Sequence, residues 1–141
     1  MPQQKFNVDI PPDLKPAQRA ELADLIIEHI VDRTDRGLDK KGNKFPPYSK
    51  DYVKSLDFKI AGKSKGDVNL QLSGDMLAAI ELLNSKRGSL TIGFERGSEE
   101  NARAEGNILG SYGKSPKKSR ARDFLGIEKS KLRELIDFVK G

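Results

Sequence analysis

The chain has 141 residues, a net charge of +5 at pH 7 and an apolar fraction of 35%, which is enough for one small hydrophobic core. It has no cysteine, which excludes disulfides, thiolate catalysis and the usual cysteine-rich zinc sites. No stretch approaches the roughly 20 consecutive apolar residues that span a bilayer, and the N-terminal residues lack the apolar core of a secretory signal. We therefore expect a single soluble domain over residues 1–141 that no signal peptide exports, that suits a reducing cytoplasm and that does not contact a membrane.

Basic residues are concentrated in two segments. Residues 37–66 hold eight lysines against three aspartates, and residues 111–122 hold five basic residues and no acidic one. Since each segment has a net charge of +5 and the whole chain also has +5, the rest of the chain has −5. Both segments are rich in Gly, Ser and Lys, so we expect two extended, flexible basic loops over residues 37–67 and 110–121. Within the first, Gly42-Asn43 favours a turn.

Apolar periodicity predicts the first strand and the first helix. Residues 5–10 alternate apolar and polar side chains, as a half-buried strand does, and Pro11 ends the pattern. A four-residue apolar repeat then predicts a long helix with Asp13 as its N-cap and Gly37 as its stop. The inward face of this helix comprises Leu22, Ala23, Leu25, Ile26 and Ile30.

The middle of the chain predicts short elements followed by a hairpin. Residues 49–56 favour a short helix, and residues 68–72 alternate like a strand. Residues 73–77 predict a turn that leads into one helical turn. Residues 79–95 predict two apolar strands joined by Ser85-Lys86-Arg87-Gly88.

Three further elements complete the predicted fold. Ser98 can cap a short helix that runs toward Leu109, and Phe124 to Ile127 predict a strand packed on the hairpin. The last helix presents Leu132, Leu135, Ile136 and Val139 on one face, which we expect to pack against the sheet. The fold class is therefore α+β, with a small antiparallel sheet packed against a long N-terminal helix and a C-terminal helix.

Patterns that could mark a catalytic, metal or cofactor site fail on inspection. Gly62-Lys63-Ser64 and Gly113-Lys114-Ser115 lack the glycine five residues earlier that a phosphate-binding loop needs. A calcium loop that starts at Asp32 would place Arg36 at a ligand position. His29 falls beside the apolar face of the first helix, which favours a partly buried structural histidine over a general base. We expect no enzyme activity, no metal and no cofactor.

The two basic loops allow three interpretations. They could be solvated surface, or a surface that binds nucleic-acid phosphates through counterion release. They could also be arms that become ordered only against a protein partner, because they are too polar to fold alone. The composition of the loops leaves these alternatives open.

Four short signatures follow one another along the chain. They comprise Gly42, Phe45, Pro47, Tyr48 and Ser49; Leu72, Ser73, Gly74, Leu77 and Ile80; Thr91, Ile92 and Gly93; and Ala121, Arg122, Phe124, Leu125 and Gly126. Their order and spacing, over roughly residues 13 to 139, resemble the virion-morphogenesis or tail-completion family of Mu-like phages, which is related to the head-tail neck proteins of other tailed phages. Lys41, Phe45, Ala79 and Asp123 stand where that family usually has Asp, Trp, Ser and Pro.

The resemblance implies a structural virion protein that completes the tail or joins head and tail in the neck. Copies would form a ring and contact neck or connector proteins and tail terminator or tube proteins, without catalysis. The residues expected to contact a partner are Phe45, Tyr48, Lys114, Lys117, Lys118, Arg120 and Arg122. The alternative function is a basic nucleic-acid-binding module that contacts DNA through its lysine-rich loops, and non-specific DNA contact is a possible addition to the first function.

Overall fold

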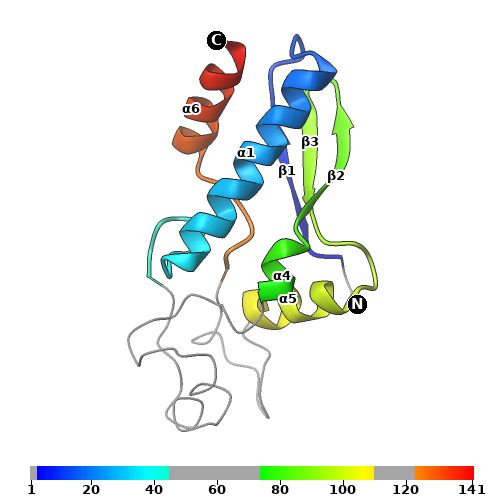
Figure 1. Cartoon of the computed structure of the whole chain (residues 1–141), viewed down its shortest axis with the longest axis vertical. Helices are drawn as coiled ribbons and strands as arrows, with labels where there is room; N and C mark the ends of the chain where they lie inside the picture. The colour runs from blue at the N-terminus through cyan, green and yellow to red at the C-terminus, as the bar shows by residue number, and fades with distance from the viewer. Residues whose placement is uncertain (1–2, 45–73, 110–122) are drawn as a thin grey trace, which may run out of the picture.

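The computed structural model describes residues 3–44, 74–109 and 123–141, and within them it has the predicted α+β class (Figure 1). The predicted helix at 49–56, the predicted strand at 68–72 and most of the two predicted basic loops lie outside the described residues. The elements in chain order are β1 (Lys5–Asp9), α1 (Pro16–Asp35), α4 (Gly74–Ala78), β2 (Glu81–Lys86), β3 (Ser89–Gly93), α5 (Glu99–Leu109) and α6 (Lys129–Lys140).

The three described strands form one antiparallel sheet in the order β1-β3-β2. β3 is central and pairs with β1 from Lys5↔Gly93 to Asp9↔Ser89. The hairpin is confirmed, but its turn is shorter than predicted, because Lys86 and Ser89 still pair across it. Only Arg87 and Gly88 connect the strands, and Gly88 takes a φ of +89° that favours glycine.

Gly93 allows the first strand to approach the central one closely. A Cβ at this position would overlap the carbonyl oxygen of Gln4 and lie 2.7 Å from the Cα of Lys5. Both are backbone atoms, so neither can move aside without moving the strand. The close approach also lets the backbone N–H of Phe94 donate to the Gln4 carbonyl at 3.0 Å.

The N-cap of helix α1 is Lys15, so the prediction of Asp13 as N-cap is wrong. Pro16 takes the first helical position, where its fixed φ is compatible with the helix and its missing N–H costs nothing. The backbone N–H of Lys15 donates to Oε1 of Gln18 at 2.9 Å. At the other end the predicted stop is confirmed, since Gly37 has a φ of +78° and donates its N–H to the Thr34 carbonyl.

The core lies between α1 and the inward face of the sheet. Leu22, Ile26 and Ile30 of α1 are fully buried, as are Leu90 and Ile92 of β3. α1 contacts β2 and β3, which places its predicted apolar face on the sheet.

The last helix contributes the apolar face that its spacing predicts. Val139 is buried, and Leu132, Leu135 and Ile136 are half-buried against the core. The principal neighbour of α6 is α1, beside which it lies in Figure 1. The two helices thus form one layer.

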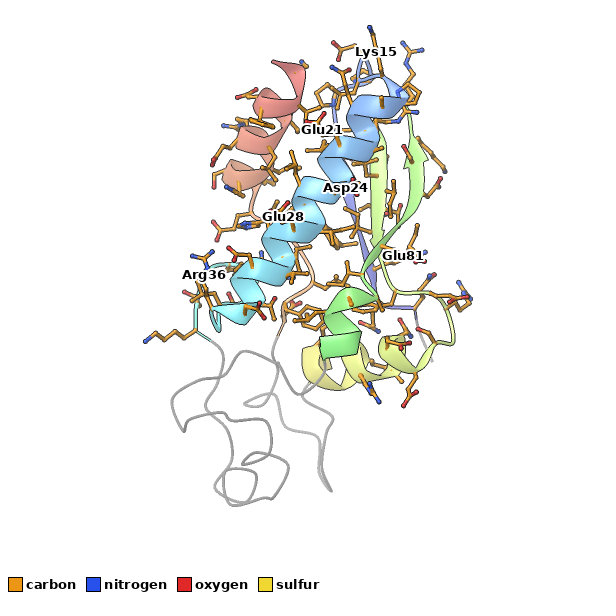
Figure 2. The ribbon with its side chains drawn as sticks, in the orientation of Figure 1. Lys15, Glu21, Asp24, Glu28, Arg36 and Glu81 are labelled. Atoms are coloured by element: carbon orange, nitrogen blue, oxygen red, sulfur yellow. The ribbon has the colours of Figure 1, made fainter. Side chains whose placement is uncertain are left out.

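The solvent side of α1 is acidic. Figure 2 shows Glu21, Asp24 and Glu28 along this helix, and all three side chains are exposed. Their spacing of three and four residues puts them on one face. Among the helices that the structure describes, none has the length and apolar character needed to cross a bilayer.

The G93A variant should be strongly destabilised, because its methyl group meets backbone atoms of β1. We expect a loss of about 1–3 kcal/mol or more in the free energy of unfolding, measured by urea denaturation. G126A is the matched control, since a Cβ at Gly126 meets only the side chain of Lys40, 2.9 Å away at Cδ. Equal losses in the two variants would show that the approach of β1 is not what requires glycine.

Candidate functional site

The segment before α6 is not the strand that its sequence predicts. Phe124 and Leu125 are buried and Ile127 is half-buried, so their predicted packing in the core is confirmed. Residues 123–128, however, form no strand and join no sheet. The reason is that the carbonyls of Phe124 and Gly126 accept hydrogen bonds from a side chain rather than from a neighbouring strand.

That side chain is Arg33, in the last turn of α1. It is only 3% exposed. Its Nη1 donates to the carbonyl of Gly126 at 3.0 Å, and its Nη2 donates to the carbonyl of Phe124. The planar guanidinium suits two acceptors that lie side by side, which an ammonium group could not bind in the same way.

Nearby carboxylates offset the burial of this charge. Burial lowers the pKa of Arg33, while Asp39, Glu128 and Asp123 act in the opposite direction. The guanidinium remains protonated, because an arginine side chain keeps its proton in proteins. The result is a buried cation held by two carbonyl dipoles with three acidic residues nearby.

The turn that follows α1 is closed by its own hydrogen bonds. Oδ1 of Asp39 accepts the backbone N–H groups of Lys41 and Asn43, each at 2.9 Å. The Asp39 N–H donates to the Asn43 carbonyl at 2.7 Å, and Gly42 takes a φ of +83°. Residues 37–44, the start of the first predicted loop, are therefore a defined turn, with the predicted Gly42-Asn43 at its tip.

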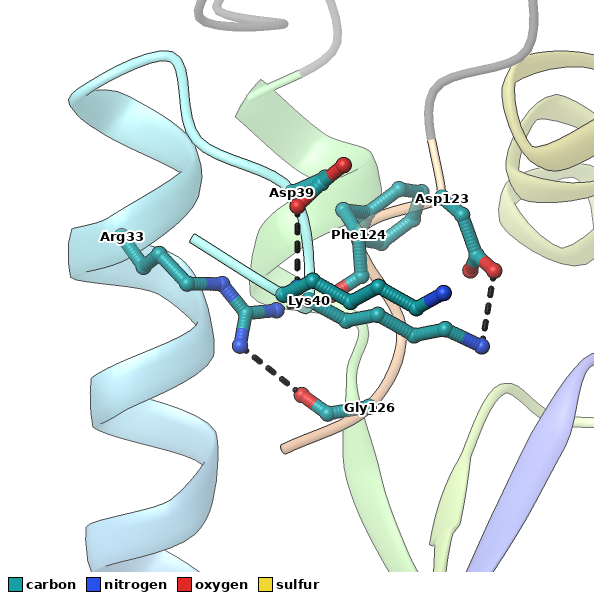
Figure 3. A network of polar contacts seen from close by, with 7 residues as sticks. Arg33, Asp39, Lys40, Asp123, Phe124 and Gly126 are labelled. Carbon is teal, nitrogen blue, oxygen red and sulfur yellow. Dashed lines mark hydrogen bonds and ion pairs between the residues drawn. The ribbon is translucent and has the colours of Figure 1, made fainter. Parts of the chain in front are cut away.

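Lys40 fastens this turn to the segment before α6. Its backbone N–H donates to the carbonyl of Asp123 at 2.9 Å, and its Nζ lies 2.8 Å from Oδ2 of the same residue. Its aliphatic chain lies over Gly126, where an added Cβ would stand 2.9 Å from Cδ of Lys40 and displace that flexible side chain. Figure 3 shows these contacts together; we call the group formed by Arg33, Asp39, Lys40, Asp123, Phe124 and Gly126 the Arg33 junction.

An aromatic contact connects the Arg33 junction to the sheet. The ring of Phe124 meets that of Phe94 edge to face, with centroids 6.2 Å apart and planes at 79°. Both rings are fully buried, and Phe94 directly follows β3. The end of α1, the turn after it and the segment before α6 are thus held to the hairpin.

The neighbouring helix α5 is fixed to the N-terminal strand in a similar way. Ser98 is its N-cap, as predicted, and accepts the backbone N–H of Asn101 at 3.1 Å. Asn101 is fully buried, and its Oδ1 accepts the backbone N–H of Gln4 at 2.6 Å. α5 also contacts α4, so both helices lie at the same end of the body as the Arg33 junction (Figure 1).

The predicted partner-contact residues cannot be placed on this framework. Phe45, Tyr48, Lys114, Lys117, Lys118, Arg120 and Arg122 all lie outside the described residues. Their chain neighbours Lys44 and Asp123 are described, and both belong to segments that Lys40 holds together. Within residues 3–44, 74–109 and 123–141, no group of three His, Asp or Glu side chains is placed to hold a metal ion.

Sequence reasoning missed the Arg33 junction. The signal for it is the position of Arg33, three residues after Ile30, where it continues the buried face formed by Leu22, Ile26 and Ile30. A charged residue on an apolar face implies a buried partner. The sequence does not show that the partner is a pair of carbonyls more than 90 residues away.

Comparison of the chain with protein-family models, with curated proteins and with solved structures gave no match. What this end of the body does must therefore be inferred from its own residues.

His29 is half-buried on α1, as predicted. Burial lowers its pKa below the usual value of 6.5, the positive charges of Arg33, Lys131 and Arg36 lower it further, and Asp32 acts in the opposite direction. The folded protein therefore favours the neutral imidazole. Its contribution to stability is complete above pH 6.5 and is lost as the pH falls through the pKa of the folded state.

The imidazole of His29 should titrate below pH 6.5 in the folded protein, which NMR can follow without ambiguity because the chain has one histidine. The melting temperature should fall when the pH is lowered from about 7.5 to 5.5, a range in which few other side chains titrate. H29Q should reduce that fall. A pKa at or above 6.5 would contradict the assigned environment.

Loss of the Arg33 guanidinium should destabilise the protein by about 3–5 kcal/mol, because two buried carbonyls lose their hydrogen-bond donors. The matched control is R36A on the same helix, where the exposed Arg36 makes only a 3.6 Å ion pair with Asp32. The control should lose less than about 1 kcal/mol. Urea denaturation of R33A and R36A compares them, and similar losses would show that the buried hydrogen bonds contribute little.

Proposed function

We propose that this protein is a structural component of a phage virion that completes the tail or joins head and tail in the neck. It acts through contacts between copies in a ring and through contacts with neighbouring neck, connector or tail proteins. It is present in the virion, and in the host cytoplasm during assembly. The support comes from the four sequence signatures and from the structural demands at their described positions.

The signature residues fill positions where the fold constrains the residue type. Gly93 lets β1 approach β3, and Gly42 occupies the left-handed position of the turn after α1. Gly126 lies beneath Lys40 and presents its carbonyl to Arg33. This is the observation that carries the proposal: Gly42 and Gly93, from two of the signatures, stand where a positive φ or a close backbone approach favours glycine, and Gly126, from a third, lies against the side chain of Lys40.

The apolar members of the signatures belong to the same framework. Leu77 and Ile80 are buried where α4 leads into β2, and Ile92 is buried in the central strand. Phe124 packs on Phe94 in the Arg33 junction. At the described positions the signature residues therefore build the framework of the body.

The proposed partner contacts extend from the Arg33 junction. Phe45 follows Lys44 in the chain, and Arg122 precedes Asp123, so the two basic segments join the body at residues that the junction holds together. Because the two attachment points are fixed relative to each other, the segments lose less conformational entropy when they bind a partner than they would if each point moved independently. We assign the contacts with neighbouring virion proteins to Phe45, Tyr48 and the basic residues of 110–122.

Limited proteolysis with trypsin tests this function, because the basic segments hold many lysines and arginines. Mixing the protein with phage neck and tail proteins should slow cleavage at Lys114, Lys117 and Lys118 by about tenfold or more. A variant with Phe45 and Tyr48 both changed to Ala should keep the melting temperature of the free protein and lose this protection. Cleavage that no such protein slows would contradict the proposal.

Duplex DNA serves as the competing ligand in the same assay. If the protein is instead a nucleic-acid-binding module, DNA should protect these sites at physiological salt, and the protection should weaken steeply as salt is raised. K114A/K117A/K118A would then abolish it. For the proposed virion function, DNA should protect only at low salt.

A further inference from the structure

Each edge strand of the described sheet has one side without a partner among the described strands. β1 and β2 each pair with β3 on one side, and no other described strand pairs with their outer sides. Both are antiparallel to β3, so they run parallel to each other. A sheet whose two edge strands run parallel can accept another copy of itself in the same orientation, with β2 of one copy beside β1 of the next.

The two edge strands carry opposite charges at the same register positions. Lys5 of β1 and Glu81 of β2 both pair with Gly93, so they lie in one row across the sheet. Asp9 and Lys86 both pair with Ser89 and form a second row at the other end of the strands. Cross-strand partners point to the same side, so all four side chains lie on the face away from α1.

The register of β2 keeps these rows aligned. Five residue steps separate Glu81 from Lys86, whereas four separate Lys5 from Asp9. An irregularity between Leu82 and Asn84 absorbs the extra residue, so both charged ends of β2 still fall in the rows of β1. The middle row is neutral and polar, with Asn7 hydrogen-bonded to Thr91 at 2.6 Å.

Within the described part of the molecule, none of these four charged side chains has an ion-pair partner. All four residues are exposed, and none of them takes part in an ion pair there. Figure 2 shows Glu81 at the start of β2. Charged side chains on edge strands usually protect a sheet against aggregation, and charges of any sign serve that purpose. Protection therefore does not explain why the two edges carry opposite charges in each row.

We infer that copies of this chain associate head to tail through these edges, with Glu81 beside Lys5 and Lys86 beside Asp9 of the next copy. The two strands extend one sheet across the contact in parallel pairing. Because the contact joins two different edges, it is heterologous and generates a ring when the rotation between copies closes. The inference rests on the proposed function, and it names the partner as a second copy and the surface as the sheet edges.

Reversal of the charges on one edge tests the contact. K5E/D9K and E81K/K86E should each weaken self-association of the full chain by about tenfold or more in sedimentation experiments at low salt, since two attractive pairs become repulsive. An equimolar mixture of these two variants should recover association, because each reversed edge meets the other. The four side chains are exposed, so melting temperatures should stay near that of the wild type.

The same variants distinguish head-to-tail contact from a two-fold contact between identical edges. In an antiparallel β1–β1 pair, Lys5 would face Asp9 of the other copy, and K5E/D9K would leave that pairing attractive. Association retained by K5E/D9K alone would therefore overturn the inference. A wild-type chain that stays monomeric at every concentration and salt would overturn it as well.

A disulfide readout captures weak association, because the natural chain has no cysteine. Oxidised K5C/E81C should give a ladder of linked copies on a non-reducing gel. Within one copy the two positions are separated by β3, at about twice the strand spacing of 4.8 Å, which is too far for a disulfide. K5C/N84C, whose positions lie in different rows, is the control and should stay monomeric.

Failure of this inference can be told from failure of the proposed function. If only the edge contact is wrong, the charge-reversed chains will associate as the wild type does, or neither will associate, yet neck and tail proteins will still protect the basic segments from trypsin. Loss of that protection would contradict the virion function itself.

Discussion

A buried guanidinium needs acceptors wherever it is placed, and the body of this protein is organised around meeting that need. Arg33 continues the apolar face of α1 into the core, where an unpaired charge would be very costly. The carbonyls of Phe124 and Gly126 supply the acceptors. Those carbonyls are therefore withdrawn from strand pairing, and the segment before α6 forms no strand. Lys40 can then reach Asp123, which fixes the turn after α1.

Local patterns predicted most of the described fold because most of its elements are locally determined. Strand β1, helices α1 and α6 and the hairpin follow from apolar periodicity, and α5 follows from Ser98 and the residues after it. The N-cap of α1 was misplaced because Asp13 is the better capping side chain, whereas Pro16 fixes where the helix can begin. Asp13 and Pro16 are competing signals for the start of the helix, and the fixed φ of the proline decides the outcome.

Long-range contacts account for what the sequence did not reveal. An apolar run such as Phe124 to Ile127 resembles a strand, and only the distant Arg33 decides otherwise. The need for glycine at position 93 likewise depends on the approach of β1, which no local pattern contains. For the candidate site, the predicted contact residues lie outside the described part of the chain, so their roles remain predictions, while the Arg33 junction came from the structure alone.

The order of these contacts along the chain has a consequence for synthesis on the ribosome. β1 is made first, but its partner strand begins at Ser89, and Arg33 meets its acceptors only when Gly126 has emerged. Helix α1 can pack its apolar face on the hairpin once Gly93 has emerged, but Arg33 still lacks these acceptors at that stage. The end of α1 can therefore be completed only after the segment before α6 has been made. Non-local closure of this kind is slow, and the unfinished chain needs protection from aggregation while it is being made.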